Sequence, residues 1–213
     1  MISDPHTSQP LELPRAQSSP APRPEPPNRL SWSRSELAGR LVELSSCGDG
    51  AGLTLAFELV AQSQLAGEPV AWIAGRTATF FPPDAARSGI DLEALPVVRV
   101  ADAPSAARAA DKLVRSGAFG LVVLDLAENA RIPLPLESRL LGLASKHGAA
   151  VLFLTEKKGE ASSLGSLISL RAQSLRRKTA EDRFTCEARV VKDKRRGPGW
   201  SHREVRHGPA GLR

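Results

Sequence analysis

The run Leu121-Val122-Val123-Leu124-Asp125 constrains the fold of this chain more than any other sequence feature. Four consecutive apolar residues followed by a carboxylate are typical of a parallel β-strand that is buried on both faces. Such a strand needs helices on both sides of its sheet, because a solvent-facing side would leave half of these side chains in water. The run therefore predicts an α/β domain.

Short apolar runs and helical segments alternate on both sides of this strand, which predicts further parallel strands joined by crossover helices. After Ser166, apolar and polar residues alternate singly, so the C-terminal part is expected to be antiparallel. We expect an α/β fold with a mostly parallel twisted sheet flanked by helices. The expected strands are 39–44, 69–73, 121–125, 149–154 and one around 184–190, and the expected helices are 54–65, 103–116, which ends at Gly117, and one around 136–144.

The first 30 residues contain 8 of the 17 prolines and include the stretch Pro-Ala-Pro-Arg-Pro-Glu-Pro-Pro at 20–27. Such a segment cannot form a regular hydrogen-bond ladder or bury much apolar surface. The predicted organisation is a disordered proline-rich arm at 1–32, a core domain at 33–208 and a short tail at 209–213.

Positive charge is concentrated near the C-terminus. Residues 171–213 carry 13 basic and 5 acidic side chains, whereas residues 1–170 carry 16 and 18, and the whole chain has a net charge of +6. This asymmetry favours an acidic partner such as nucleic acid or an acidic protein surface. Cys47 and Cys186 form no metal-ligand pattern, and no apolar run is long enough to span a bilayer. We therefore expect a cytoplasmic protein without a structural metal or a membrane partner.

A glycine-rich segment, Cys47-Gly48-Asp49-Gly50-Ala51-Gly52-Leu53-Thr54, joins the first expected strand to the first expected helix. A phosphate-binding loop has the pattern Gly-x-x-x-x-Gly-Lys-Ser/Thr, in which the lysine neutralises phosphate charge and the hydroxyl holds magnesium. Here Gly52 and Thr54 match this pattern, but Cys47 replaces the first glycine and Leu53 replaces the lysine. The sequence thus predicts that this loop does not hold ATP, and we expect no nucleotide cofactor.

Several segments in the same order and spacing resemble the core of the RecA recombinases, from about residue 39 to residue 208. Gly-Arg-Leu-Val-Glu-Leu at 39–44 resembles the strand that enters the RecA phosphate loop, and Leu-Val-Arg-Ser-Gly-Ala at 113–118 is similar to the run that leads into the Walker B strand. Ala-Arg-Val-Val-Lys-Asp-Lys at 188–194 resembles a late RecA strand, and the segment 85–95 is also similar. The resemblance implies a RecA-like fold.

The chain differs from the RecA recombinases at the positions that carry out ATP hydrolysis and DNA binding in that family. By the resemblance, Arg76 stands in place of the water-positioning glutamate and Glu156 in place of the glutamine that senses the γ-phosphate. Asp125 matches the Walker B aspartate; we expect it to be held by loop N–H groups, the alternative being a magnesium contact. The two DNA-binding loops are shortened to about 127–135 and 157–165.

A truncated RecA-like chain of this kind resembles the ImuA-type accessory proteins of the SOS mutasome. That implies a protein without ATPase activity, associated with the nucleoid, that binds the RecA recombinase and an ImuB-like homologue of Y-family polymerases.

The basic residues near the C-terminus are the candidate binding residues. By the resemblance, Lys192 and Lys194 match two lysines that reach the nucleotide of a neighbouring recombinase protomer, so we expect them, with Arg195 and Arg196, to bind such a partner. The alternatives are a solvated basic strand and direct contact with DNA phosphates. Arg171, Arg176, Arg177 and Lys178 form a second candidate for DNA phosphates, although a charged edge that prevents sheet aggregation is an equal alternative.

Three other functions stay open from the sequence. One is a divergent but active nucleotide-binding enzyme, the second a cell-division inhibitor of the SulA type, and the third a DNA-binding module. The four histidines are scattered without a carboxylate at a telling spacing, so we assign them no catalytic role.

Overall fold

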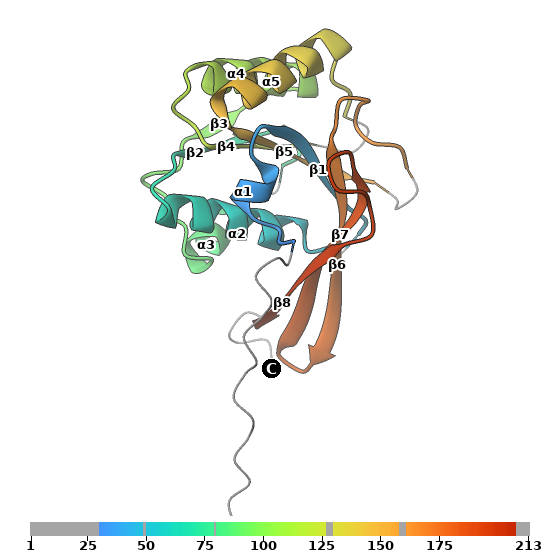
Figure 1. The fold of residues 1–213 in the computed structure, drawn as a ribbon. Coiled ribbons are helices and arrows are strands. Elements are labelled where there is room, and N and C mark those ends of the chain that lie inside the picture. Colours follow the sequence, from blue (N-terminus) through green and yellow to red (C-terminus); the bar gives the residue numbers. More distant parts are fainter. Residues whose placement is uncertain (1–29, 49, 79, 127–129, 158–160, 208–213) are drawn as a thin grey trace, which may run out of the picture.

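The computed structural model describes residues 30–48, 50–78, 80–126, 130–157 and 161–207 (Figure 1). Most of the expected arm at 1–32 and the whole expected tail at 209–213 lie outside these residues. The elements, in chain order, are α1 (Arg34–Leu37), β1 (Arg40–Ser46), α2 (Gly52–Leu65), β2 (Val70–Ala74), α3 (Pro82–Arg87), β3 (Val97–Arg99), α4 (Ala103–Arg115), β4 (Leu121–Asp125), α5 (Leu134–His147), β5 (Ala150–Glu156), β6 (Leu170–Ala180), β7 (Arg183–Asp193) and β8 (Ser201–His207).

All eight of these strands belong to one sheet, in the order β3-β2-β4-β5-β1-β6-β7-β8. The six strands from β3 to β6 in this spatial order, which include β1 and β2, pair in parallel. The last three strands, β6, β7 and β8, pair antiparallel. The prediction of a mostly parallel α/β sheet with an antiparallel C-terminal part is confirmed. Strands β1, β2, β4 and β5 are short and almost wholly buried, as expected where both faces are covered.

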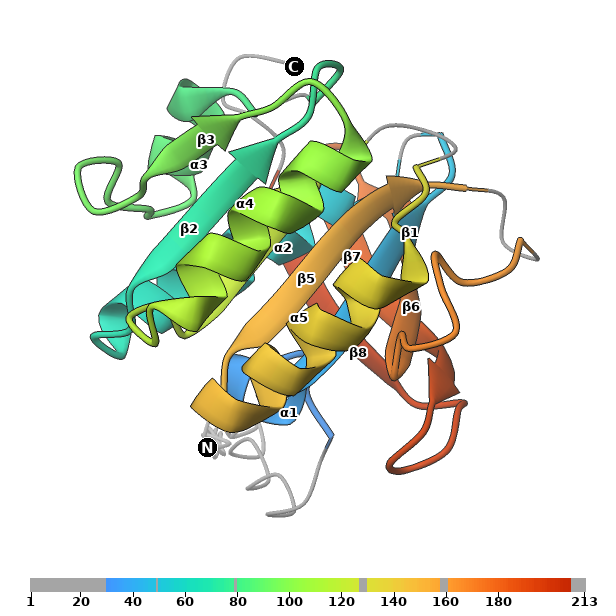
Figure 2. The same ribbon diagram turned by 90° about the horizontal axis from the view of Figure 1, so that it is seen from above.

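Helices cover both faces of the parallel part. Helices α4 and α5 lie side by side on one face, and α1, α2 and α3 lie on the other (Figures 1 and 2). Each face has its own hydrophobic cluster, because successive residues of a strand point to opposite sides. Leu41 and Val151 face α4 and α5, whereas Val42 and Leu152 face α2.

Local sequence signals explain where the predicted helices begin and end. At the start of α4, the Asp102 carboxylate accepts a hydrogen bond of 2.7 Å from the backbone N–H of Ser105, which is a typical N-cap. Gly117, just after α4, has a φ of 71°, and Gly148 at the C-cap of α5 has a φ of 64°. These left-handed conformations favour glycine. The expected helix at 103–116 and its end at Gly117 are confirmed.

The antiparallel part was expected, but only β7 was placed within it, and β6 and β8 were not. Three short elements were not expected from the sequence either, namely α1, α3 and β3. Each has between three and six residues, too few for a 3.6-residue or two-residue period to stand out. Helix α3 begins at Pro82, a residue compatible with the first helical turn.

Trp32, the last residue of the expected arm, packs in the core. The side chain of Trp32 is only 1% exposed and belongs to the hydrophobic cluster that lies beneath α2. A buried tryptophan is part of the folded domain, because its removal would expose a large apolar surface. The core domain thus includes Trp32.

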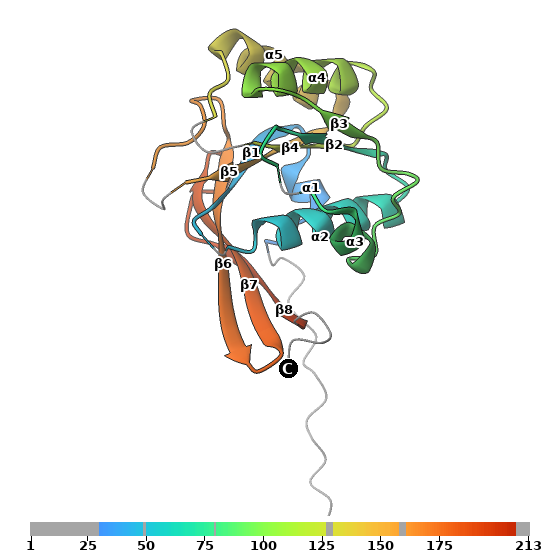
Figure 3. The same cartoon turned by 180° about the vertical axis from the view of Figure 1, so that it is seen from behind.

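The antiparallel strands extend beyond the body of the domain. Figures 1 and 3 show β6 and β7 running past α2 as a long hairpin, with β8 along its outer edge. Along β6 most residues up to Ser174 are buried, and all from Arg176 onward are exposed. The hairpin therefore begins in the core and ends in solvent.

Candidate functional site

The glycine-rich loop leads from β1, which ends at Ser46, to α2, which begins at Gly52. Leu53 and Thr54 lie in the first turn of α2. No side chain caps this helix end at its N-cap residue, Ala51. Leu53 is half-buried and packs against the hydrophobic cluster on this face of the sheet. The position that carries lysine in a phosphate-binding loop is thus filled by an apolar side chain that contributes to the core.

Two glycines of this loop lie directly against a pair of hydroxyl groups. The hydroxyls of Ser46 and Ser174 share a hydrogen bond of 2.7 Å that joins β1 to β6. A methyl group at Gly50 would lie 2.8 Å from the Ser174 hydroxyl, and one at Gly52 would overlap the Ser46 hydroxyl. The loop therefore needs glycine for packing, independently of any bound phosphate.

The loop borders an open groove of about 1380 Å³ that separates it from the inner side of the long hairpin. Gly52, Leu53 and Thr54 line one side, and Arg176 and Phe184 of the hairpin line the other. Asp125 also lines this groove, at the end of β4. The structure therefore brings together the loop residues and the carboxylate that the sequence singled out, whereas Cys47 lines a neighbouring pocket and is exposed.

Asp125 is 7% exposed, and burial raises its pKa to about 6. The nearby indole N–H of Trp72 opposes this rise only in part. Among the described residues, neither the Oδ2 atom of Asp125 nor the Trp72 indole nitrogen has a hydrogen-bond partner. The expectation that loop N–H groups hold this side chain is not met within the described part of the chain, where Asp125 is bound to its surroundings through its backbone carbonyl, which accepts from Gly75.

The positions implied for water activation and phosphate sensing are both in solvent. Arg76 is exposed in the turn after β2, and Glu156 is exposed at the end of β5. Glu156 lines the groove, whereas Arg76 is not among its lining residues.

Lys192 and Lys194 lie on the same side of the sheet end and face the segment that follows β5. The Lys192 ammonium is 3.4 Å from the Ser163 hydroxyl, and the Lys194 ammonium donates to the Ser166 carbonyl at 2.8 Å. Burial lowers the pKa of Lys192, and the charge of Lys194 lowers it further. Asp193 points the other way, into the protein. The two lysines are thus close together at the surface.

Arg195 and Arg196 do not continue this pair. The Arg195 guanidinium donates to the Ala38 carbonyl, and Arg196 forms an ion pair of 3.1 Å with Glu36 of α1. The four residues of the predicted partner-binding group therefore divide into two lysines that face residues 163–166 and two arginines that hold α1.

The predicted DNA-binding run is also divided. Arg176, Arg177 and Lys178 are exposed on the projecting part of β6, and the Arg176 guanidinium lies 5.3 Å from the centre of the Phe184 ring. Arg171 is 4% exposed and donates to the Ala161 carbonyl and the Ser45 hydroxyl. Of the four candidate DNA-binding residues, Arg171 is therefore the one whose guanidinium is buried and bound within the protein, whereas the other three are exposed.

A buried polar network that the sequence analysis missed surrounds Glu43, at the centre of β1. Its carboxylate is 2.6 Å from the Lys157 ammonium, accepts from the Thr155 hydroxyl at 2.9 Å and accepts from the Leu164 backbone N–H at 2.7 Å. Glu43 has no exposed surface, and buried charges of this kind need partners. The network fixes part of the shortened loop at 157–165; residues 158–160 lie outside the described residues. The sequence did contain a signal for this network, because Glu43 lies among apolar residues in an expected strand, and a carboxylate there needs buried partners.

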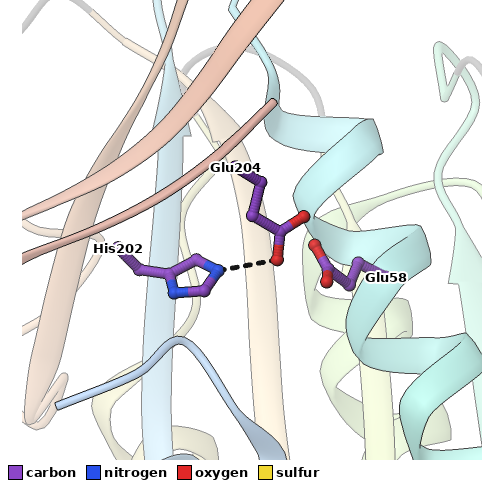
Figure 4. A group of neighbouring side chains, drawn as sticks. All are labelled: Glu58, His202 and Glu204. Atoms are coloured by element: carbon purple, nitrogen blue, oxygen red, sulfur yellow. Dashed lines mark hydrogen bonds and ion pairs between the residues drawn. The ribbon is translucent and has the colours of Figure 1, made fainter. Parts of the chain in front are cut away.

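A second missed cluster joins α2 to β8 (Figure 4). Glu58, His202 and Glu204 each offer a possible metal-ligand atom, and these atoms lie within 4.8 Å of one another. Arg206 forms ion pairs with both carboxylates, and the His202 ring nitrogen is 2.8 Å from Glu204. Because the carboxylates already have these partners, we interpret the cluster as an ion-pair contact that holds β8 against α2.

Burial and the neighbouring Glu204 raise the pKa of Glu58 to about 7. Burial alone would raise the pKa of Glu204, but the hydrogen bond with His202 and the charge of Arg206 lower this pKa to about 2. The pair therefore keeps a proton to higher pH than two separate carboxyl groups would.

None of the helices in the described residues is both long and apolar enough to cross a membrane.

No protein-family model matches this chain. Parts of it are similar to RecA proteins. It is 30% identical to Protein RecA of Picosynechococcus sp. over 137 residues, which is 55% of this chain and 39% of that relative. It is 39% identical to Protein RecA of Nocardioides sp. over 88 residues, 41% of this chain and 25% of that relative. With Protein RecA of Fusobacterium nucleatum the identity is 31% over 112 residues, 51% of this chain and 29% of that relative.

The chain spans less than half the length of these curated relatives. The sequence similarity and the observed sheet point to the same scaffold: a mostly parallel sheet with helices on both faces and an antiparallel C-terminal extension. The chain therefore has a RecA-like fold.

Proposed function

We propose that this chain is a RecA-related adaptor without ATPase activity that acts in DNA-damage-induced mutagenesis. In this proposal it binds the active RecA recombinase through Lys192 and Lys194, and it also binds an ImuB-like homologue of Y-family polymerases. The main supporting observation is the contrast between two places in the chain. The phosphate loop carries Leu53, packed against the core, where its pattern requires lysine, whereas the lysine pair near the C-terminus is held together at the surface.

The proposed lack of ATPase activity is supported by the chemistry of the loop and of its neighbours. Leu53 cannot neutralise phosphate charge, the exposed Glu156 would repel a triphosphate, and Arg76 is not a base that activates water. Charge-assisted contacts to a phosphate contribute roughly 1.5–3 kcal/mol each, so loss of the lysine alone weakens nucleotide binding strongly. Isothermal titration of the chain with ATP and magnesium is expected to give no binding heat at millimolar nucleotide.

The docking role follows from the placement of the two lysines. Their ammonium groups are close enough for Lys194 to lower the pKa of Lys192, and the carboxylates near Lys192, those of Glu43 and Glu137, are both buried. Two neighbouring ammonium groups at a surface attract a phosphate. The nucleotide exposed at one end of an ATP-loaded recombinase filament is a ligand of this chemistry.

The test is a pulldown with RecA filaments assembled on single-stranded DNA with a non-hydrolysable ATP analogue. We expect the variant Lys192→Ala/Lys194→Ala to lose at least tenfold in filament binding. The matched control is Lys112→Ala/Lys146→Ala, which removes the same charge from exposed lysines on α4 and α5 and should bind like the wild type. Equal binding by both double variants would contradict the docking proposal. Co-purification with the polymerase-like subunit tests the second partner.

A DNA-binding role is the second candidate, and it is favoured by the exposed Arg176, Arg177 and Lys178 on the projecting hairpin. Binding through these residues would fall steeply with salt, because phosphate contacts release counterions. Alanine at all three positions should then reduce the slope of log affinity against log salt by about 2–3. An unchanged slope would exclude the hairpin as the DNA contact.

A further inference from the structure

The charged side chains that line the groove beside the glycine-rich loop are mostly paired with one another. Glu58 forms an ion pair of 2.9 Å with Arg206, and Asp84 lies 3.8 Å from Arg87. Arg176 on the hairpin lies over the ring of Phe184. The Glu58–Arg206 and Asp84–Arg87 pairs therefore need no ligand to balance their charge, whereas the contact of Arg176 is with a neutral aromatic ring.

Two carboxylates at the carboxyl end of the parallel sheet are the exception. Among the described residues, the Oδ2 atom of the buried Asp125 has no hydrogen-bond partner, and Glu156 has no ion pair. Both line the groove, as do Leu53 and Thr54. A buried carboxylate without a partner is costly, and a cation placed against it removes that cost.

Apolar side chains line the same groove as these carboxylates, together with polar ones. Leu53 and Leu154 line the groove beside them, and Phe81 and Val205 are 56% and 63% exposed at its borders. A small hydrated ion would leave this apolar surface in water. A lysine or arginine side chain combines an apolar stem with a cationic head, so it matches both features.

We propose that the groove between the glycine-rich loop and the hairpin binds an extended segment of a partner protein, through a lysine or arginine that pairs with Asp125 and Glu156. Apolar side chains next to that basic residue pack on Phe81 and Val205. The inference depends on the proposed function in one respect, namely that the loop does not hold ATP. In a working ATPase the groove beside the phosphate-binding loop holds a negatively charged phosphate. In this chain the same place would hold a positively charged lysine or arginine side chain.

The experiment selects binding peptides from random sequences, so no partner protein has to be known in advance. The full chain is immobilised and a phage-displayed library of random 12-residue peptides is selected against it. We expect the recovered peptides to share a lysine or arginine flanked by apolar residues. Their affinities are then measured by fluorescence anisotropy for the wild type, Asp125→Asn, Glu156→Gln and the control Asp84→Asn, whose carboxylate lines the same groove but is paired with Arg87.

Asp125→Asn should weaken binding at least tenfold, whereas Asp84→Asn should change it less than twofold. Replacing the basic residue of the peptide by norleucine should weaken binding to the wild type at least tenfold. The same replacement should have a smaller effect on Asp125→Asn, where only Glu156 remains as a partner, and no further effect when Glu156→Gln is added to Asp125→Asn. Recovery of no peptide, of peptides without a basic residue, or of peptides indifferent to Asp125→Asn would overturn the inference. Binding abolished by millimolar magnesium, or self-association of the chain through this groove in sedimentation, would also overturn it.

The titration with ATP separates the two proposals. If the chain binds ATP and magnesium, the proposed function fails, whatever the peptides do. If the chain binds no ATP and the peptides bind the wild type and Asp125→Asn with equal affinity, the present inference alone fails.

Discussion

The guanidinium of Arg40 lies 2.6 Å from the carboxylate of Asp193, and both side chains are at most 1% exposed. The pair joins the start of β1 to the end of β7, across 153 residues of sequence. Asp193 also accepts hydrogen bonds from the Arg195 backbone and the Trp200 indole. Burial would raise the pKa of Asp193, but these bonds and Arg40 outweigh it and lower that pKa. Because Asp193 points inward, its neighbours Lys192 and Lys194 both point to the opposite side.

Removal of one partner of this pair should destabilise the protein strongly. Asp193→Ala leaves the buried Arg40 charge without a partner, and we expect the free energy of unfolding to fall by about 3–5 kcal/mol. Urea unfolding measures the loss. Asp84→Ala, which breaks the exposed pair with Arg87, should cost less than about 1 kcal/mol. A combined Arg40→Leu/Asp193→Leu variant should lose less than Asp193→Ala alone; a larger loss would contradict the account.

Asp125 should make the protein less stable as pH rises. Its pKa of about 6 in the folded protein lies above the ordinary value of 3.8, so the fold favours the protonated form. The corresponding stability is present below about pH 4 and is lost as pH rises through 6.

The variant Asp125→Asn cannot ionise at this position and should avoid this loss. At pH 7.5 we expect it to be about 2–3 kcal/mol more stable than the wild type, and at pH 4 about equal. Urea unfolding at both pH values measures the difference, and Asp84→Asn is the exposed control. An advantage of Asp125→Asn that did not depend on pH would contradict this explanation.

The packing of the glycine-rich loop can be tested at Gly52. A methyl group there overlaps the hydroxyl of Ser46, so Gly52→Ala should lower the free energy of unfolding by about 1–3 kcal/mol. Ser46→Ala removes the overlapping oxygen and should restore much of that stability in the double variant, a departure from additivity that a double-mutant cycle measures. Gly142→Ala on α5 is the control, because nothing lies within 4 Å of the added methyl group and helix propensity should make it neutral or stabilising. Strict additivity of Gly52→Ala and Ser46→Ala would show that this overlap is not the cause.

Trp32 should contribute to the stability of the core although a proline-rich sequence precedes it. Trp32→Ala removes a side chain that is 1% exposed, and we expect a loss of about 3–5 kcal/mol in thermal or urea unfolding. Leu65→Ala, at an 87% exposed position, should change stability by less than about 0.5 kcal/mol. A loss at Trp32 no larger than that at Leu65 would place the residue outside the folded domain.

Much of the fold could be predicted because its signals are local. The apolar run of β4, the 3.6-residue period of α4 and the alternation in β7 each depend on neighbouring residues, and all three elements form where they were expected. The loop at 47–54 was also identified from its residues alone. The elements α1, α3 and β3 could not be predicted, because they are short and held by tertiary contacts.

The candidate site was predicted only in part, because binding residues depend on which side chains are exposed. Arg171 and Arg176 lie on the same strand and look alike in the sequence, yet one is bound inside the protein and the other is in solvent. The pairing of Arg195 and Arg196 with the α1 region likewise separates them from Lys192 and Lys194.

The sequence by itself determined the class of fold and the presence of leucine at position 53 of the glycine-rich loop, since periodicity and residue identity are properties of short segments. Only the tertiary structure decided which charges are paired, because partners such as Arg40 and Asp193 are far apart in the chain and meet when the sheet forms. It also buried Asp125 so that, among the described residues, its Oδ2 atom has no hydrogen-bond partner, because burial depends on packing between elements that are distant in the sequence.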